Sequence, residues 1–258
     1  MTVFLILIAA SILGGAANAL AGGGTFLTFP ALLLAGIAPV RANATASLVL
    51  LPGAFASAWV YRDTIQKSTS KKFLRLMLGA SILGSLVGSL LLMFTSNATF
   101  ARLVPWLLLA ATAVFSLAPR LRQWAMRSAP GAGSSHESMP KLLLGQVIIS
   151  AYGGYFGAGM GVLMITLYLV ATNLDVHAAS GLRMICSCAI NTLAVLIFAT
   201  RGALDYKVGI PMLFAGVAGG YIGALLVKRL DANLARRAIL AYAWALTAWF
   251  FGRILLGR

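Results

Sequence analysis

Ten apolar stretches, separated by short polar or basic loops, constrain the fold of this chain more than any other feature. They cover residues 2–20, 25–38, 43–61, 73–94, 99–118, 141–156, 158–172, 177–200, 207–228 and 236–256. Six of them (43–61, 73–94, 99–118, 177–200, 207–228 and 236–256) are long enough to cross a bilayer, because about 20 helical residues span its hydrocarbon layer. The pattern predicts an all-α polytopic membrane protein.

The composition supports this prediction and excludes several classes of protein. Hydrophobic residues make up 60% of the chain and charged residues 10%, against roughly 25% charged in an average soluble domain. A soluble protein could not bury this much apolar surface. The net charge of +15 does not indicate nucleic-acid binding, because the basic residues lie in loops between apolar stretches rather than on one exposed face. The lipid bilayer is the expected environment.

The four shorter stretches form two pairs, and each pair is interrupted by a glycine cluster. The clusters lie at 21–24 and at 153–161. A straight helix over residues 2–38 would be about 55 Å long, which is too long for one crossing. We therefore expect each pair to be a hairpin or re-entrant pair that turns at its glycines.

The chain also repeats itself at an offset of 137 residues. Residues 22–27 match residues 159–164, and a small-residue helix start follows in both places, at 42–45 and 179–182. We divide the chain into a first transmembrane repeat (1–119), a basic cytoplasmic linker rich in Pro, Gly and Ser (120–140), and a second transmembrane repeat (141–258). Each repeat would consist of one glycine-broken pair followed by three spanning helices.

A pair that returns to its own side gives each repeat an odd number of crossings. An odd number inverts the second repeat relative to the first, as in many secondary transporters. One side then holds thirteen basic residues: Arg62, Lys67, Lys71, Lys72, Arg75, Arg120, Arg122, Arg127, Lys141, Lys228, Arg229, Arg236 and Arg237. The other side holds six: Arg41, Arg102, Arg201, Lys207, Arg253 and Arg258.

The positive-inside rule makes the side with thirteen basic residues cytoplasmic. The long basic loops would then face the cytoplasm of a bacterium, and both termini would lie outside its inner membrane. An arrangement in which each broken pair crosses once has the same totals. We prefer the hairpin arrangement because it alone places all three basic loops on one side.

Residues for familiar catalysis are scarce. The five acidic residues, Asp63, Glu137, Asp175, Asp205 and Asp231, all fall in loops or at the ends of stretches. The histidines, His136 and His177, form neither a metal-ligand spacing nor a convincing catalytic set. We therefore predict no catalytic residue, no metal ligand and no cofactor.

The membrane interior instead offers glycines, small polar side chains and one arginine. A glycine break exposes backbone N–H groups at a helix start, where the helix dipole favours an anion. Arg183 lies six residues into stretch 177–200 and would attract an anion, unless it snorkels to the interface or pairs with Asp175. The predicted binding residues for a small anionic solute are Gly22, Gly23, Gly24, Thr25, Asn43, Thr45, Ser47, Gly159, Gly161, Ser180, Arg183 and Asn191.

Two motifs resemble a known family. Residues 22–30 (GGGTFLTFP) with 42–47 (ANATAS), and residues 153–161 (GGYFGAGMG) with 179–181 (ASG), are similar to the repeated signature of the sulfite exporter TauE/SafE family. The resemblance covers nearly the whole chain. It implies transport of a sulfur-containing anion, such as sulfite or a sulfonate, across a bacterial inner membrane. This chain departs from the family where Gly181-Leu182-Arg183 replaces the usual Gly-Thr-Ser, so its substrate could differ from sulfite.

These features together lead us to expect a secondary transporter that exports a small sulfur-containing anion by alternating access between two repeats. Two other classes stay open at this stage. An intramembrane lipid-modifying enzyme would need a nucleophile or a carboxylate–histidine set, and only Asp175 with His177 approaches one. A membrane assembly partner without transport activity would need a larger binding surface than these short loops provide.

Overall fold

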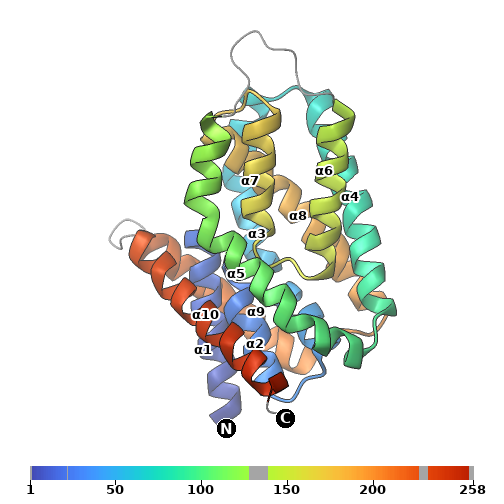
Figure 1. Ribbon diagram of the computed structural model, residues 1–258, viewed down its shortest axis with the longest axis vertical. Coiled ribbons are helices and arrows are strands. Elements are labelled where there is room, and N and C mark those ends of the chain that lie inside the picture. Colours follow the sequence, from blue (N-terminus) through green and yellow to red (C-terminus); the bar gives the residue numbers. More distant parts are fainter. Residues whose placement is uncertain (1, 22, 128–138, 227–231, 256–258) are drawn as a thin grey trace.

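The computed structural model describes residues 2–21, 23–127, 139–226 and 232–255. At residues 19–21, 57, 223–226, 232–236 and 253–255 it describes the backbone without the side chains. Within these residues the chain forms ten helices (Figure 1). They are α1 (Thr2–Ala21), α2 (Thr25–Leu34), α3 (Pro39–Ser68), α4 (Lys71–Phe94), α5 (Asn97–Arg127), α6 (Met139–Tyr155), α7 (Met160–Ala171), α8 (Val176–Thr200), α9 (Tyr206–Leu226) and α10 (Ala232–Leu255).

The helices follow the ten predicted stretches, and the differences at their ends have local causes. Helix α2 ends at Leu34 rather than at residue 38, because Gly36 adopts φ +82° and Ile37 N–H donates to the Leu32 carbonyl, which closes the helix end. Helix α3 begins four residues earlier than predicted, at Pro39, since proline favours the first position of a helix. Helix α5 continues past Pro119 to Arg127.

The predicted linker over 120–140 overlaps a helix at each end. Residues 120–127 belong to α5, and α6 begins at Met139. Residues 128–138 lie outside the described residues. The division of the chain into two repeats around this linker stays a prediction.

Three helices in the described part of the chain, α4, α5 and α8, are long and apolar enough to cross a membrane. Helix α3 makes a fourth candidate span if its two parts count as one, since it bends by 52° between Ala56 and Ala58. These four correspond to the predicted spans 43–61, 73–94, 99–118 and 177–200. The other two, 207–228 and 236–256, extend into residues that the structure does not describe.

Each glycine-broken pair turns back toward the end of the molecule from which it starts (Figure 1). Helices α6 and α7 both reach the upper end in this view, and the connection between them lies at mid-height. Helices α1 and α2 likewise start from and return to the lower end. This is the course that a hairpin interpretation requires, whereas the inverted relation of two repeats stays a prediction.

Small residues let the helices of the two predicted repeats approach closely. Helix α4 packs on α6, where a Cβ added to Gly154 would lie 2.6 Å from the Ser85 carbonyl oxygen. Helix α1 packs on α9, where a Cβ added to Gly219 would lie 2.5 Å from Ile12 Cα. Lipid chains are as apolar as the side chains of the helices, so the hydrophobic effect does not drive the helices together in a membrane. Close van der Waals packing of this kind drives their association instead.

A buried hydrogen-bond network links α4, α6 and α7. Gln146 Nε2 donates to Ser81 Oγ at 2.8 Å, and Tyr168 Oη donates to Gln146 Oε1 at 2.9 Å. All three side chains are fully buried. Because unpaired polar groups in the membrane interior are costly, this network holds the α6/α7 pair together and attaches it to α4.

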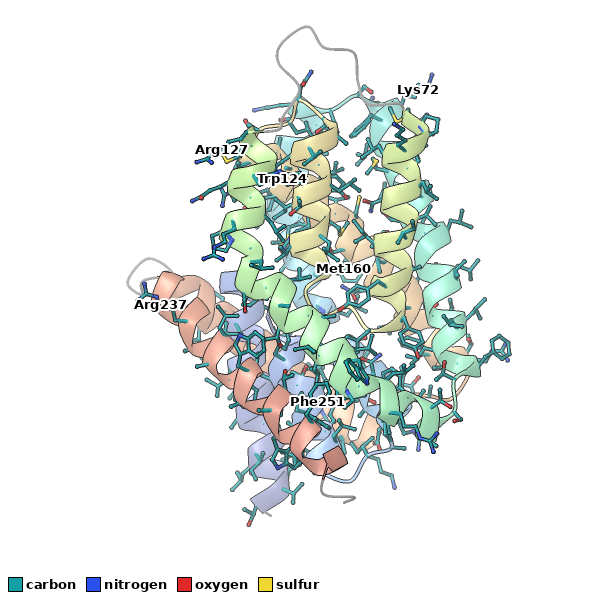
Figure 2. All side chains as sticks on the ribbon, viewed as in Figure 1. Lys72, Trp124, Arg127, Met160, Arg237 and Phe251 are labelled. Carbon is teal, nitrogen blue, oxygen red and sulfur yellow. The ribbon has the colours of Figure 1, made fainter. Side chains whose placement is uncertain are left out.

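Two basic helix ends lie at the same end of the molecule. Figure 2 shows Lys72, at the start of α4, and Arg127, at the end of α5, near the upper end. Both belong to the group of thirteen basic residues that the sequence assigns to one side. The placement agrees with that grouping for these two residues, whereas Arg237, another member of the group, lies at mid-height in the same view.

Candidate functional site

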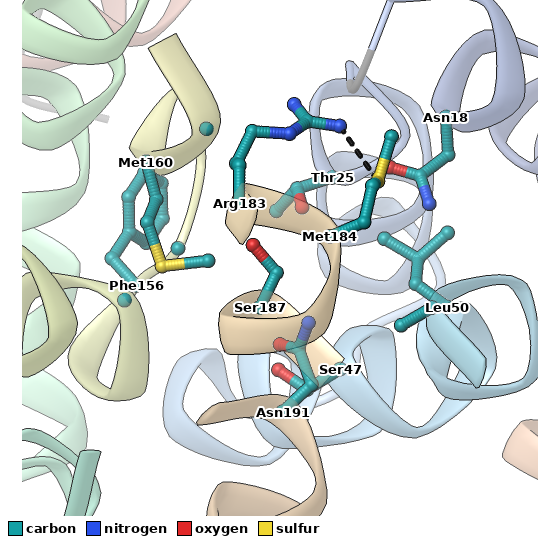
Figure 3. Close-up of a pocket in the computed structure, with 14 residues that line it drawn as sticks. Asn18, Thr25, Ser47, Leu50, Phe156, Met160, Arg183, Met184, Ser187 and Asn191 are labelled. Atoms are coloured by element: carbon teal, nitrogen blue, oxygen red, sulfur yellow. Dashed lines mark hydrogen bonds between the residues drawn. The ribbon is translucent and has the colours of Figure 1, made fainter. Parts of the chain in front are cut away.

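A small polar cavity lies where the two glycine breaks meet the middle of α3 and α8 (Figure 3). Its volume is about 80 Å³, well below the roughly 300–1,000 Å³ of a cavity for a drug-sized ligand. Six helices or their connections contribute to its wall: α1, α2, α3, α6, α7 and α8. The lining residues are Asn18, Thr25, Ser47, Leu50, Ala54, Gly153, Phe156, Gly157, Met160, Gly161, Arg183, Met184, Ser187 and Asn191.

Two short helices, α2 and α7, begin at this cavity, and the glycine breaks are the reason. Thr25 is the first residue of α2 and lines the cavity. In the second pair Gly157 and Gly159 have φ of +80° and +76°, a backbone conformation that side-chain-bearing residues rarely adopt. They turn the chain so that α7 starts at Met160, and Gly161 in its first turn lines the cavity. The positive ends of two helix dipoles therefore face one small space.

Arg183 is the charged residue of the cavity wall (Figure 3). Its Nη2 donates to Met184 Sδ at 3.0 Å, and its buried Nε has no hydrogen-bond partner. Asp63, Asp175 and Asp205 are the acidic residues that the structure describes, and none forms a salt bridge with Arg183. A guanidinium with an unsatisfied buried donor is an attractive partner for an anion, since an unpaired buried donor is costly.

The sequence alternative in which Arg183 pairs with Asp175 is not what the structure shows. Asp175 Oδ1 accepts a hydrogen bond from the Ala178 backbone N–H at 2.7 Å and so caps the start of α8. The described salt bridge of the chain joins Arg62 and Asp63, with 3.5 Å between Nε and Oδ1. Asp175 acts at the helix start, and Arg183 lies two turns further into α8.

Gly161 makes room for the guanidinium. A Cβ at this position would collide with Arg183 Nη1 and would lie 3.1 Å from both Arg183 Cδ and Cζ. The absence of a side chain on the first turn of α7 therefore lets Arg183 lie against that helix start. Arginine and helix dipole act on the same part of the cavity.

Polar side chains from both predicted repeats complete the wall. Arg183, Ser187 and Asn191 are spaced four residues apart on α8, so they project from one helix face. The first repeat contributes Thr25 from α2 and Ser47 from α3, together with Asn18 from α1. The resulting surface has one positive charge, several neutral donors and no carboxylate among its lining residues.

The cavity contains five of the twelve predicted binding residues: Thr25, Ser47, Gly161, Arg183 and Asn191. Gly22 lies outside the described residues. The remaining six do not line the cavity: Gly23, Gly24, Asn43, Thr45, Gly159 and Ser180. Two of these six still shape the site, since Gly24 precedes the start of α2 and Gly159 precedes that of α7.

The other polar residues of that group form hydrogen bonds within the protein. Asn43 Nδ2 donates to the Tyr155 carbonyl at the end of α6, at 2.9 Å, and is 2% exposed. Thr45 Oγ1 accepts from the Asp205 N–H at 3.0 Å and so ties α3 to the start of α9. Ser180 Oγ donates to the Val176 carbonyl in its own helix. These are structural contacts of the kind that small polar residues commonly make in membrane helices.

Sequence reasoning did not select Ser187, Met160, Met184 or Phe156, which also line the cavity. The spacing of Ser187, one turn after Arg183, was a usable signal for it. The two methionines and Phe156 carried no such signal, because apolar residues in an apolar stretch do not reveal which face they occupy. Among the described residues, no group of three or more His, Cys, Asp or Glu side chains could hold a metal ion.

Comparison with known proteins identifies the family. The family described as Sulfite exporter TauE/SafE matches residues 7–250. The chain belongs to this family. It is 26% identical to a probable membrane transporter protein of Haemophilus influenzae, over 90% of this chain and 88% of the relative.

It is also 25% identical to the probable membrane transporter protein YfcA of Escherichia coli K12, over 94% of this chain and 87% of that protein. No solved structure matches the chain. Family membership and the apolar helices make this TauE/SafE protein a multi-pass membrane transporter with a small solute as its cargo.

Proposed function

We propose that this protein is a secondary transporter that exports a small sulfur-containing anion, such as sulfite or an organosulfonate, by alternating access between its two repeats. The observation that carries the proposal is the Arg183 guanidinium, whose buried Nε has no hydrogen-bond partner, in a cavity where two short helices begin. The substrate would occupy this cavity. The protein would bind it without chemical change and without a metal or cofactor.

The electrostatics favour an anion over a cation or a neutral solute. Arg183 supplies a full positive charge, and the starts of α2 and α7 each contribute a partial positive charge from the helix dipole. Because the cavity wall has no carboxylate, a bound cation would meet only repulsion from these groups. A bound oxyanion would accept hydrogen bonds from Arg183 Nε and the Asn191 amide, and from Ser187 in exchange for the bond that its hydroxyl donates to Met164 Sδ at 3.6 Å.

The location of the cavity suits alternating access. It lies between α3 of the first predicted repeat and α8 of the second, next to both backbone breaks. In secondary transporters, sites at broken helices between inverted repeats open first to one side and then to the other as one repeat rocks against the other. The inversion of the two repeats is part of this proposal.

The sulfur-containing substrate and the outward direction rest on the family description, Sulfite exporter TauE/SafE. The positive-inside rule supplies the orientation, with the long basic loops in the cytoplasm and both termini outside the inner membrane. Export would then carry the anion from the side of the α3–α4 and α5–α6 connections to the opposite side.

The test is thermal stabilisation of the detergent-purified protein by sulfite, methanesulfonate, sulfate, thiosulfate and acetate. A ligand that binds only the folded protein raises its melting temperature with concentration. We expect stabilisation by one class of anion and a loss of it in Arg183→Gln, whose unliganded protein stays folded. The matched control is Arg102→Gln, which removes an exposed arginine at the start of α5.

Equal stabilisation of the wild-type protein and Arg183→Gln by every anion would contradict the proposed site. Absence of stabilisation by any anion at millimolar concentration would contradict anion binding altogether. Transport in proteoliposomes then decides direction, since export in the proposed orientation requires flux from the side of the basic loops.

A further inference from the structure

A second cavity lies beside the central one, and its character is different. It has a volume of about 410 Å³ between α1, α3, α8 and α9. Apart from Asn18, Tyr61 and Tyr221, its wall consists of glycine, proline and apolar side chains, and Val60, Val217 and Tyr221 on its outer part are exposed. The lining residues are Gly15, Asn18, Val49, Leu50, Pro52, Gly53, Ala56, Val60, Tyr61, Met184, Gly216, Val217, Gly220 and Tyr221. We refer to it as the side cavity.

The two cavities are neighbours that share three wall residues: Asn18, Leu50 and Met184. In Figure 3 these three side chains lie together on one side of the central cavity, with Met184 next to the Arg183 guanidinium. Met184 Sδ accepts the hydrogen bond from Arg183 Nη2 at 3.0 Å. A flexible thioether therefore separates a small charged space from a larger apolar one. Methionine adapts readily to the shape of a neighbouring group.

We propose that the substrate is an organic anion whose charged head occupies the central cavity and whose apolar substituent extends past Met184 into the side cavity. This inference rests on the proposed function. It follows from the different sizes and linings of the two cavities. The central cavity next to Arg183 has a volume of about 80 Å³ and admits only a small charged group, and the adjoining side cavity offers about 410 Å³ of mostly apolar space.

The specificity residues for the substituent are then Leu50 and Met184 at the junction, whereas Ala56 and Val217, which are exposed, line the outer part of the side cavity and do not line the central one. An apolar substituent gains binding free energy in proportion to the apolar surface that it buries. The head group gains from Arg183 whatever the substituent. Affinity should therefore depend separately on the charge of the head and on the length of the substituent.

The experiment measures thermal stabilisation of the full-length protein by methanesulfonate, propanesulfonate and pentanesulfonate. We expect affinity to rise by about fourfold for each methylene, the fold-change that corresponds to about 0.8 kcal/mol. Pentylammonium and 1-pentanol are the probes with the same chain and no negative charge, and we expect both to stabilise the protein weakly or not at all.

Two variants fill the side cavity: Ala56→Phe and, in case that variant fails to fold, Val217→Phe. We expect either one to abolish the gain with chain length while leaving the affinity for methanesulfonate unchanged. The matched control is Ala110→Phe, on an exposed position of α5 that lines neither cavity. It should retain the full dependence on chain length.

Three results would overturn the inference. Arg183-dependent binding with no gain from chain length would exclude an apolar substituent and leave the proposed anion transporter standing. Stabilisation by 1-pentanol equal to that by pentanesulfonate would make the side cavity a general site for apolar molecules such as lipid chains. A lack of binding by the three sulfonates and also by sulfite would remove the proposed function and this inference together.

Discussion

Gly24 and Gly161 occupy matching places in the two repeated motifs, yet their surroundings differ. A Cβ on Gly24 would lie 2.7 Å from the Gly14 carbonyl oxygen and 3.0 Å from Asn18 Cβ, and so would meet the backbone and a fixed atom of α1. A Cβ on Gly161 would meet the side chain of Arg183. The first glycine permits helix packing, whereas the second makes room for a charged group.

The same contrast extends to how each broken pair is held together. Helices α1 and α2 meet through small residues, since a Cβ on Gly14 would lie 2.8 Å from Thr28 Cγ2. Helices α6 and α7 are joined by the side-chain hydrogen bond between Tyr168 and Gln146. A repeated backbone motif thus serves close packing in one half of the chain and a charged, hydrogen-bonded site in the other.

The largest effect that this contrast predicts is on stability, in Gly24→Ala. The added methyl group would collide with the α1 backbone, which cannot yield cheaply, so we expect a loss of about 1–3 kcal/mol in the free energy of unfolding. Thermal unfolding in detergent measures it. Gly79→Ala is the control, because nothing lies within 4 Å of a Cβ there and alanine favours a helix. Equal melting temperatures for the two variants would contradict the packing role of Gly24.

The next effect concerns binding, in Gly161→Ala. Its methyl group would meet side-chain atoms of Arg183 rather than backbone, so we expect near-native thermal stability and an anion affinity lower by about tenfold, or 1.4 kcal/mol. Titration of the stabilising anion against melting temperature measures the affinity. If Gly161 acts through Arg183, the double variant Gly161→Ala/Arg183→Gln should bind no more weakly than Arg183→Gln alone. If the losses of anion affinity in the two single variants add up in the double variant, the two residues act independently.

Tyr168→Phe should produce a smaller loss that is confined to stability. It removes the hydroxyl that donates to Gln146 Oε1 in a fully buried site, which should lower the free energy of unfolding by about 1 kcal/mol. Anion affinity should not change, since Tyr168 does not line the central cavity. Tyr206→Phe, at an exposed position that starts α9, is the control and should unfold like the wild type.

The smallest effect is expected in Thr25→Val, a change of similar shape that removes one neutral hydroxyl from the cavity wall. A neutral hydrogen bond contributes about 0.5–1 kcal/mol net, so anion affinity should fall by about two- to fivefold. Thr200→Val, at the exposed end of α8, provides the comparison. A loss as large as that of Arg183→Gln would mean that the first repeat contributes more to anion binding than its neutral side chains suggest.

Much of the architecture follows from local features of the sequence. The ten helices, the two breaks and the grouping of Lys72 with Arg127 at one end could all be predicted. Membrane helices satisfy their backbone hydrogen bonds within each segment, so apolar length and helix-breaking glycines largely define them without reference to neighbours. Arg183 could be selected for the same reason, since a lone charge in an apolar stretch needs a partner or water.

Only the tertiary structure decided which polar side chains meet. Asn43, Thr45 and Ser47 are small polar residues of the same segment and were equally good candidates for the binding site. Asn43 and Thr45 instead form hydrogen bonds that attach α3 to the ends of other helices, whereas Ser47 lines the cavity. The side cavity was invisible in the sequence, because its wall is apolar like the rest of the membrane interior. Residue type and spacing determine which face of a helix a side chain occupies. The neighbour that this face meets depends on how several helices pack together.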